Sequence, residues 1–326
     1  SHGVWVRASL SGAMISGMRE GDVLYNCLPM YNSAAWVTHI FRALWMGVPV
    51  GLDPAFSVHD FWDRVRHYGA TQIFTLGAMH MFLWQAPERD DDDDNLVRHA
   101  GCIPMPEPLI EPFKARFGIE TMDQAYGQSE VMGMLHRADR GLPVKPGSLG
   151  QPQDGVEVTL LDENDLPVPT GEVGEFCVRP TEPDTIFSGY WQNPEATLKA
   201  VSSLWYHTGD LGRRDEDGEW YFVDRRSDYS RYTGRSLSSF EAERAVAAHD
   251  AVAVAAAIGI TSAELESEAE LMVFVTLVPG EKVEPEALAR FVNDNAPSFF
   301  VPRYIEIVDE LPQTPTGRVQ KFKLRE

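Results

Sequence analysis

Strand-like and helical patterns alternate over the first 115 residues of this chain. Residues 48–52 form a short apolar run, residues 58–68 carry apolar side chains at helical spacing, and residues 70–76 are rich in β-branched and aromatic side chains. Strands that alternate with helices at this spacing usually lie parallel in one sheet. The sequence therefore predicts α/β layering with parallel strands.

The composition is that of an ordinary globular protein. Of the 326 residues, 44% are hydrophobic and 24% are charged, and the length suggests about two domains. A net charge of −21 opposes nonspecific binding to nucleic acid or to anionic lipid. It still allows a small anionic ligand that is held by a few local cations and backbone donors.

The longest apolar stretch, residues 34–52, is interrupted by His39 and Arg42. A membrane-spanning helix needs about 20 predominantly apolar residues, so we expect no membrane span. A buried amphipathic helix followed by a strand fits this stretch better.

The three cysteines, Cys27, Cys102 and Cys177, are far apart in the sequence and odd in number. This spacing indicates neither a disulfide framework nor a metal site, and together with the absence of a signal peptide it predicts a reducing cytoplasm. The five aspartates at residues 90–94 can be a metal site or a solvated loop whose charges repel one another, and we favour the loop.

The second half of the chain has a different pattern. Residues 156–162 and 172–179 alternate apolar and polar side chains like antiparallel strands, and Asp217-Gly218 between two extended stretches is typical of a hairpin. We expect an α/β layer to about residue 145 and a β-rich subdomain at about residues 147–224.

After residue 224 the pattern predicts a small α+β domain, with a hinge near residues 225–229. Ser238 and Glu241 fit a capping box that begins a helix ending near residue 248. Residues 252–260, 271–278 and 304–308 are strand-like, and Pro285 precedes a helical pattern that ends near residue 295. These 100 residues are enough for a separate domain.

Four polar segments carry more Gly, hydroxyl and charged residues than core packing needs. In residues 125–130, a Gly allows close approach to a ligand, and the hydroxyl and carboxylate of Ser129 and Glu130 suit a phosphate and Mg²⁺. A turn in which Ser129 caps a helix explains the same residues.

The other three polar segments also have structural alternatives. Asp210, in residues 205–211, suits two adjacent ribose hydroxyls, or it forms an Asx-type turn. The cations of residues 224–235 can meet ribose or phosphate oxygens, or they form a polar linker. Residues 314–321 can carry a mobile positive charge, or they form a solvated tail.

Taken together and in this order, the segments resemble the AMP-forming acyl-CoA synthetase family, the adenylate-forming superfamily that includes aryl-CoA ligases, peptide-synthetase adenylation domains and firefly luciferase. The resemblance runs essentially from end to end. Its motifs are Tyr-Gly-x-Thr/Ser-Glu at residues 126–130, Gly-Glu-x-Gly-Glu at 171–175, Gly-Tyr within 188–191, Tyr-x-Thr-Gly-Asp at 206–210, the hinge motif at 224–234 and the C-terminal loop at 311–321.

The resemblance implies two-step activation of a carboxylic acid. ATP gives an acyl-adenylate and pyrophosphate, and coenzyme A then takes the acyl group while AMP leaves. Such a site positions reactants and neutralises charge on phosphate oxygens. The domains implied are a partial AMP-binding adenylation core at residues 1–224 and a mobile C-terminal AMP-binding-enzyme domain at residues 225–326.

The resemblance also implies residue roles. Ser129 contacts the α-phosphate, Glu130 holds Mg²⁺, Tyr126 lies against the adenine, and Asp210 binds the ribose with help from Arg225. The remaining implied ligand contacts are made by Gly127 and Gln128 of the first motif, by a loop formed by Gly101 and the Cys102-Ile103-Pro104 run beside the adenine and acyl group, by Gly234 beside the pantetheine tunnel and by residues 76–79 at the acyl pocket. Ser227 is implied to be the pivot about which the C-terminal domain rotates.

Three departures from the family pattern bear on the chemistry. The phosphate loop ending in Lys-Gly-Val is missing, and residues 1–4 resemble its tail, so we expect a fragment that cannot adenylate efficiently alone. Arg318 stands where the catalytic Lys is usual, with Lys321 as a second candidate for that role, so adenylation is expected to be slow or altered. Asn32 replaces a usual His beside the acyl and thiol channels.

Three functions remain open on the sequence. The leading one is an acyl-CoA ligase that acts on a small carboxylic acid. The others are a noncatalytic nucleotide- or acyl-binding homologue and an adenylating enzyme that loads a carrier-protein thiol. The sequence leaves homodimer formation open as well.

Overall fold

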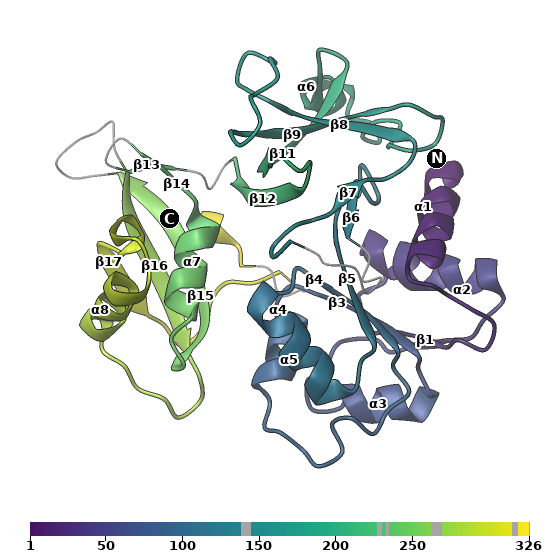
Figure 1. Cartoon of the computed structure of the whole chain (residues 1–326), viewed down its shortest axis with the longest axis horizontal. Helices are drawn as coiled ribbons and strands as arrows, with labels where there is room; N and C mark the ends of the chain where they lie inside the picture. The colour runs from purple at the N-terminus through teal and green to yellow at the C-terminus, as the bar shows by residue number, and fades with distance from the viewer. Residues whose placement is uncertain (138–144, 227–229, 233–234, 262–268, 315–318, 326) are drawn as a thin grey trace. The chain divides into compact units, whose positions relative to one another are not determined.

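The computed structural model describes residues 1–137, 145–226, 230–232, 235–261, 269–314 and 319–325 (Figure 1). The chain divides into two compact units. The first consists mainly of Ser1–Thr208 and Arg213–Tyr221, and the second mainly of Gly209–Gly212 and Phe222–Thr314. Among the described residues, no helix is both long enough and apolar enough to cross a membrane.

A seven-stranded sheet in the order β2-β1-β3-β4-β5-β6-β7 forms the base of the first unit. Its strands are β1 (Leu24–Asn26), β2 (Val50–Leu52), β3 (Gln72–Leu76), β4 (His99–Ile103), β5 (Thr121–Tyr126), β6 (Leu135–Arg137) and β7 (Gln151–Pro152). The first five pair in parallel, whereas β6 and β7 are antiparallel to their neighbours. The predicted α/β layering with parallel strands is confirmed.

Helices pack around this sheet and against one another. They are α1 (His2–Ile15), η1 (Ala35–Ile40), α2 (Phe41–Met46), α3 (Phe61–Tyr68), α4 (Ala78–Gln85) and α5 (Glu107–Phe117). Phe61 of α3 and Phe113 of α5 are fully buried in one core with Ile73 and Met122 of the strands. Such burial of large side chains against the sheet is the dominant favourable term in folding.

Two helix predictions differ from the structure in detail. Helix α3 begins at Phe61, later than expected, because Ser57 and Asp60 form a turn in which the Asp60 amide donates to Ser57 Oγ (3.4 Å). The helical stretch within residues 34–52 contains a π-helical portion, η1, that buries His39 completely. Single π-helical turns recur at functional sites, and a helical period alone does not reveal them.

The aspartate run at residues 90–94 forms a turn, but it is less solvated than expected. Asp92 is 6% exposed, and its Oδ2 accepts from Arg116 Nε at 2.7 Å. Asp91 pairs with Arg89 and with Arg66. Cations from neighbouring elements therefore offset the repulsion that the sequence suggested.

The β-rich part of the chain contains an antiparallel sheet, most of which belongs to the first unit, whereas residues 209–212 and 222–225 belong to the second. The sheet consists of β8 (Val156–Leu161), β9 (Val173–Pro180), β10 (Val201–Ser202), β11 (Trp205–Arg214) and β12 (Trp220–Arg225), with α6 (Pro194–Ala200) preceding β10. The order is β10-β11-β9-β8, and β12 pairs with β11. Gly218 has a φ of +88° in the turn between β11 and β12, which confirms the predicted hairpin.

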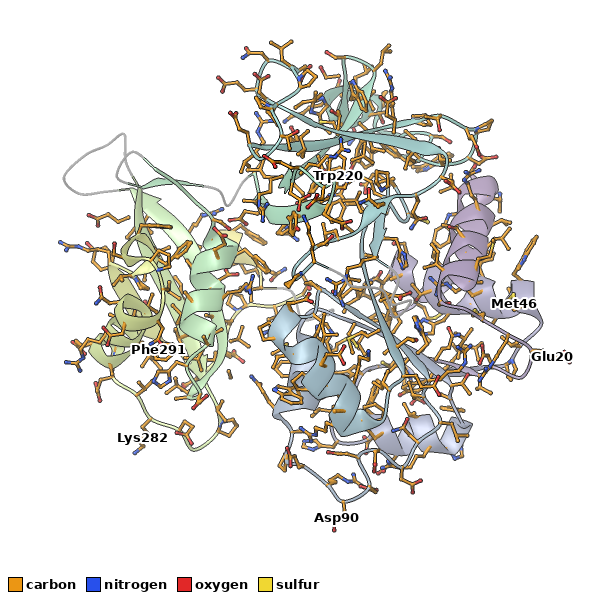
Figure 2. All side chains as sticks on the ribbon, in the orientation of Figure 1. Glu20, Met46, Asp90, Trp220, Lys282 and Phe291 are labelled. Carbon is orange, nitrogen blue, oxygen red and sulfur yellow. The ribbon has the colours of Figure 1, made fainter. Side chains whose placement is uncertain are left out.

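The second unit has a small α+β core of its own. Its elements are β13 (Ser230–Tyr232), β14 (Arg235–Leu237), α7 (Ser239–Ala247), β15 (Val252–Thr261), β16 (Ala269–Leu277), α8 (Pro285–Asn295), η2 (Ser298–Phe300), β17 (Tyr304–Ile307) and η3 (Lys321–Leu324). Strand β16 pairs antiparallel with β15 and parallel with β17. Figure 2 labels Phe291 on α8, whose ring packs edge-on against His249.

Helix α7 begins as the sequence predicted. Ser238 is its N-cap, and Ser238 Oγ accepts from the Glu241 amide at 3.2 Å. The buried carboxylate of Asp224 also accepts from the Ser239 amide at 2.5 Å. A negative group near the first turn satisfies free amides and complements the helix dipole.

Lys321 is held within the second unit by two side chains of α7. Its Nζ lies 2.7 Å from Glu243 Oε1 and donates to Ser239 Oγ at 2.6 Å. The two charged side chains are only 15% and 19% exposed. Burial raises the pKa of Glu243 above its usual 4.5, and Lys321 opposes that rise. Removal of the cation thus leaves a poorly solvated carboxylate without its partner.

We predict that Lys321→Met destabilises the chain by about 1–3 kcal/mol at pH 7. Loss of the cation raises the pKa of Glu243 further, so the deficit grows as the pH rises through that pKa and shrinks toward pH 4.5. Urea unfolding followed by circular dichroism at several pH values measures this dependence.

The matched control is the double variant Lys321→Met/Glu243→Gln. The amide oxygen introduced by Glu243→Gln can still accept from the Ala257 amide, which donates to Glu243 Oε1 at 2.8 Å. We expect the double variant to recover much of the lost stability and to lose the pH dependence. If the losses of unfolding free energy in Lys321→Met and in Glu243→Gln add up to the loss in the double variant, the two side chains are not coupled.

Candidate functional site

The first polar motif forms a tight loop at the carboxyl end of β5. The Gln128 amide donates to Val131 O (3.1 Å), and the Val131 amide donates back to Gln128 O (3.2 Å). A Cβ on Gly127 would lie 2.7 Å from Gly133 N and 3.0 Å from Val131 O. Only glycine fits at this position, because both obstructing atoms belong to the backbone.

The side chain of Gln128 ties this loop to strand β11. Its Nε2 donates to Thr208 O at 2.9 Å, and its Oε1 accepts from Tyr206 OH at 2.7 Å. Tyr206 is only 4% exposed. The carboxamide uses both its donor and its acceptor side. It therefore holds the loop of residues 126–130 next to the Tyr-x-Thr-Gly-Asp motif.

Tyr126 ends β5, and its ring stacks on that of Phe176 with centroids 5.2 Å apart and an interplanar angle of 29°. Phe176 is fully buried in β9 and also packs on Trp220, which Figure 2 labels in the β-rich part. Tyr126 itself is only half-buried. This arrangement supports the Tyr126 ring from one side with a fixed aromatic stack.

Glu130 is fixed by the Gly-Tyr segment. Tyr190 OH donates to Glu130 Oε1 at 2.9 Å, and the Phe187 amide donates to Glu130 O at 2.7 Å. Burial, together with the adjacent Glu130 carboxylate, raises the pKa of Tyr190 above its usual 10.0. Tyr190 therefore keeps its proton and remains a donor at physiological pH.

Ser129 is exposed at the tip of the loop and faces a second hydroxyl. Its Oγ lies 2.9 Å from Ser33 Oγ, which follows β1 in the chain. The neighbouring Asn32, at the position where the resemblance implies His, accepts from the Ala34 amide at 2.9 Å. Asn32 thus has a local role in starting the helical segment.

These groups suit an anionic ligand with a hard cation. Ser33 and Ser129 share one hydrogen bond, so one of the two hydroxyls can donate to a ligand, and a carboxylate oxygen is the type of ligand that Mg²⁺ prefers. Glu130 Oε1 accepts from Tyr190, and an ionised carboxylate has further acceptor sites on its two oxygens. Glu130 therefore fits a magnesium ligand on chemical grounds.

Asp210 and Arg225 both belong to the second unit and lie on paired strands. Strand β11 carries Asp210, strand β12 ends at Arg225, and the two strands are hydrogen-bonded neighbours. The Arg226 amide donates to Gly209 O at 2.8 Å, so the residues next to both candidates are in direct contact. The structure brings this proposed ribose-binding pair to one place in the sheet.

The loop expected at residues 101–104 begins only after Ile103, so Gly101 and Cys102 are not part of it. Both residues lie inside β4, which pairs with β3 from His99 to Ile103. Cys102 is fully buried, its Sγ accepts from Thr75 Oγ1 at 3.4 Å, and burial raises its pKa to about 12. The backbone N–H and C=O groups of the His-Ala-Gly-Cys-Ile run form hydrogen bonds in the sheet. Irregular structure begins only after Ile103.

Three expected positions, Ser227, Gly234 and Arg318, lie outside the described residues. Lys321 is described and is paired with Glu243, which favours a structural role for its ammonium group. In the segment expected to line the acyl pocket, Met79 is 6% exposed and belongs to the main core of the first unit.

Sequence reasoning assigned no role to Ser33, Phe187 or Tyr190. Ser33 contacts Ser129 across 96 positions, and Tyr190 contacts Glu130 across 60. The Gly-Tyr segment at residues 188–191 drew attention to Tyr190, but no spacing rule connects it to Glu130. Such contacts depend on which loops meet in space.

Comparison with known proteins supports the motif assignments. Residues 1–191 match the model of the AMP-binding enzyme family, and residues 241–318 match the AMP-binding enzyme C-terminal domain. A crotonobetaine/carnitine–CoA ligase from Salmonella arizonae is 32% identical over 312 residues. That alignment covers 94% of this chain and 59% of the relative, so the chain spans about three-fifths of the length of the curated relatives it matches.

Solved structures share the fold. A benzoate CoA ligase from Burkholderia xenovorans is 27% identical, with a TM-score of 0.87 over 100% of this chain and 65% of that one. An amide bond synthetase from Marinactinospora thermotolerans is 26% identical, with a TM-score of 0.82 over 99% and 65%. With a family model that covers more than half of its length, the chain belongs to the AMP-binding enzyme family.

Proposed function

We propose that the complete protein is an ATP-dependent carboxylic acid:CoA ligase that works through an acyl-adenylate. The observation that carries the proposal is the convergence of three motifs of the first unit on one loop. Gln128 contacts Tyr206 and Thr208, and Glu130 contacts Tyr190. Core packing does not require hydroxyls, a carboxylate and a supported aromatic ring around one exposed turn.

Each residue of the loop has a role in this proposal. Tyr126, supported by Phe176, lies against the adenine, and Ser129 donates to the α-phosphate. Glu130, oriented by Tyr190, holds Mg²⁺. When bound, the magnesium ion neutralises charge on the phosphate oxygens. Gln128 fixes the distance between these groups and β11, because catalysis of this kind depends on positioning.

Asp210 and Arg225 are proposed to bind the ribose hydroxyls. Their placement on neighbouring strands supports a joint role, since a carboxylate accepts from both hydroxyls while a guanidinium donates. We keep the proposed division into an adenylation core at residues 1–224 and a C-terminal domain at residues 225–326, with Gly234 beside the coenzyme A path.

Coenzyme A is the proposed acceptor because the similar proteins include a crotonobetaine/carnitine–CoA ligase and a benzoate CoA ligase. The substrate class proposed is a small carboxylic acid. Transfer to a carrier-protein thiol and a noncatalytic binding role are the alternatives, and loading assays with both acceptors separate them. A cytoplasmic location and homodimer formation remain predictions from the sequence.

Binding of a nonhydrolysable acyl-sulfamoyl adenosine tests the proposal on this chain. Calorimetry with a panel of acyl groups should show one site per chain that AMP displaces. Absence of binding by a folded chain, at concentrations at which AMP-binding relatives are saturated, would argue against the proposed site.

We predict that Gln128→Leu weakens binding of this analogue by about tenfold or more. The variant removes one hydrogen bond to Tyr206 OH and one to Thr208 O, and each such bond is worth about 0.5–1.5 kcal/mol. The matched control is Gln151→Leu, in which an exposed Gln loses contacts with Gly218 and Glu219. Equal affinities of the two variants would contradict the role of Gln128.

We predict that Tyr190→Phe raises the Mg²⁺ concentration needed for half-maximal adenylation about three- to tenfold in the complete enzyme. The variant removes one hydrogen bond to a carboxylate, worth about 1 kcal/mol or somewhat more. Tyr221→Phe is the control, because Tyr221 OH donates to Asp215 Oδ2 at 3.0 Å in a similar Tyr–carboxylate pair. The readout is the Mg²⁺ concentration at half-maximal rate, and a shift shared by both variants would count against Tyr190.

Arg318 is proposed to supply the cation of the adenylation step. We predict that Arg318→Ala lowers the single-turnover rate of adenylation in the complete enzyme by at least tenfold, whereas thioester formation from added acyl-adenylate changes little. Arg318→Lys should retain or increase the rate, because a compact ammonium can approach a phosphate oxygen more closely. An unchanged rate for Arg318→Ala would exclude this role.

A further inference from the structure

A second cluster of reactive side chains lies on the opposite face of the β9–β11 strand pair. Glu175 and Cys177 are two residues apart in β9, and His207 lies between Tyr206 and Thr208 in β11. Successive side chains of a strand point to opposite faces. His207 therefore points away from the face on which Tyr206 meets Gln128, and none of the three residues takes part in the proposed adenylate site.

The three side chains converge at one nitrogen. His207 Nδ1 lies 3.1 Å from Glu175 Oε2 and 3.4 Å from Cys177 Sγ, and the three ligand atoms lie within 4.8 Å of one another. A tetrahedral ion with bonds of about 2.0–2.3 Å separates its ligand atoms by roughly 3.3–3.6 Å. The two distances from His207 Nδ1 are thus close to those of a tetrahedral site, and the ligand atoms of Glu175 and Cys177 lie within 4.8 Å of each other.

A neutral His207 ring meets a carboxylate at each of its two nitrogens and can donate a proton to only one of them. The Nε2 atom is buried and has no hydrogen-bond partner among the described residues, although Asp165 Oδ1 lies 3.6 Å away. If the proton is on Nδ1, the lone pair of Nε2 faces a carboxylate. If the proton is on Nε2, the lone pair of Nδ1 faces Glu175. Neither neutral tautomer suits both sides.

A cation at Nδ1 removes this conflict. The ring then carries its proton on Nε2, which faces Asp165, while Nδ1 and Glu175 Oε2 both bind the ion. Asp165 is itself held, because its Oδ2 accepts from Ser202 Oγ (2.9 Å) and from Ser203 Oγ (2.7 Å). A carboxylate behind the second nitrogen is the usual companion of a metal-bound histidine.

We propose that Glu175, Cys177 and His207 bind a divalent transition-metal ion of the zinc type. Thiolate and imidazole ligands select zinc-like ions, whereas Mg²⁺ and Ca²⁺ prefer oxygen ligands alone. Binding forms the metal–sulfur bond at the expense of the Cys177 S–H bond, and the proton passes to solvent. Water takes the fourth position, which the 14% exposure of the His207 side chain makes accessible.

The site acts on the strands that carry the adenylate-binding groups. It links β9, which supports Tyr126 through Phe176, to β11, which contacts Gln128 through Tyr206 and Thr208. Occupation stabilises this strand pair without touching the nucleotide. The proposal stands independently of the proposed ligase activity, because its evidence lies on the other face of the sheet.

Titration of the metal-free chain with Co²⁺ tests the proposal, since Co²⁺ reports its ligands by absorption. We expect one equivalent to produce a thiolate-to-cobalt charge-transfer band that Zn²⁺ abolishes and Mg²⁺ does not. Cys177→Ser should lose the band, whereas Cys102→Ser should keep it, because Cys102 is a buried thiol outside the cluster. Zn²⁺ should raise the thermal midpoint of the parent chain and of Cys102→Ser only.

Asp165→Asn gives a second, milder readout. We expect it to keep the band and to weaken Co²⁺ binding by about 10- to 100-fold, as changes behind a metal-bound histidine do. A chain that is folded by circular dichroism but shows no charge-transfer band would overturn the proposal. The same holds if Cys177→Ser binds Co²⁺ like the parent chain, or if His207 carries protons on both nitrogens in the presence of Zn²⁺.

Discussion

The carboxamide of Gln128 is the interaction on which the site depends. Its two ends hold the loop after β5 against Tyr206 and Thr208 of β11, of which Tyr206 is buried and Thr208 is partly buried. A polar tie of this kind is specific because each unsatisfied atom would be costly. The main sheet and the β-rich part thereby present Tyr126, Ser129 and Glu130 in one arrangement.

The strand pair β9–β11 uses its two faces for different purposes. One face carries Phe176, Tyr206 and Thr208, which support the loop of the first motif. The other carries the Glu175–Cys177–His207 cluster. Because side chains alternate along a strand, a change on one face alters the other through the backbone they share.

Local rules predicted local structure well, and contacts between distant segments were missed. The Ser238 cap, the hairpin at Gly218 and the parallel strands follow from short sequence patterns. The Ser33–Ser129 and Tyr190–Glu130 contacts do not, since they join loops whose meeting depends on the whole sheet. Cysteine spacing likewise gave no indication of the metal cluster, because its ligands come from two strands. The family motifs located the candidate loop, but the π-helical turn at His39 and the burial of Cys102 required the folded chain.

The most direct test of the central claim is a crystal structure of this chain with an acyl-sulfamoyl adenosine bound. The account predicts that the adenine lies on the ring of Tyr126, that the sulfamoyl group is within hydrogen-bond distance of Ser129 Oγ, and that the Gln128 bonds to β11 are kept. A fully occupied analogue that contacts neither Tyr126 nor Ser129 would contradict it.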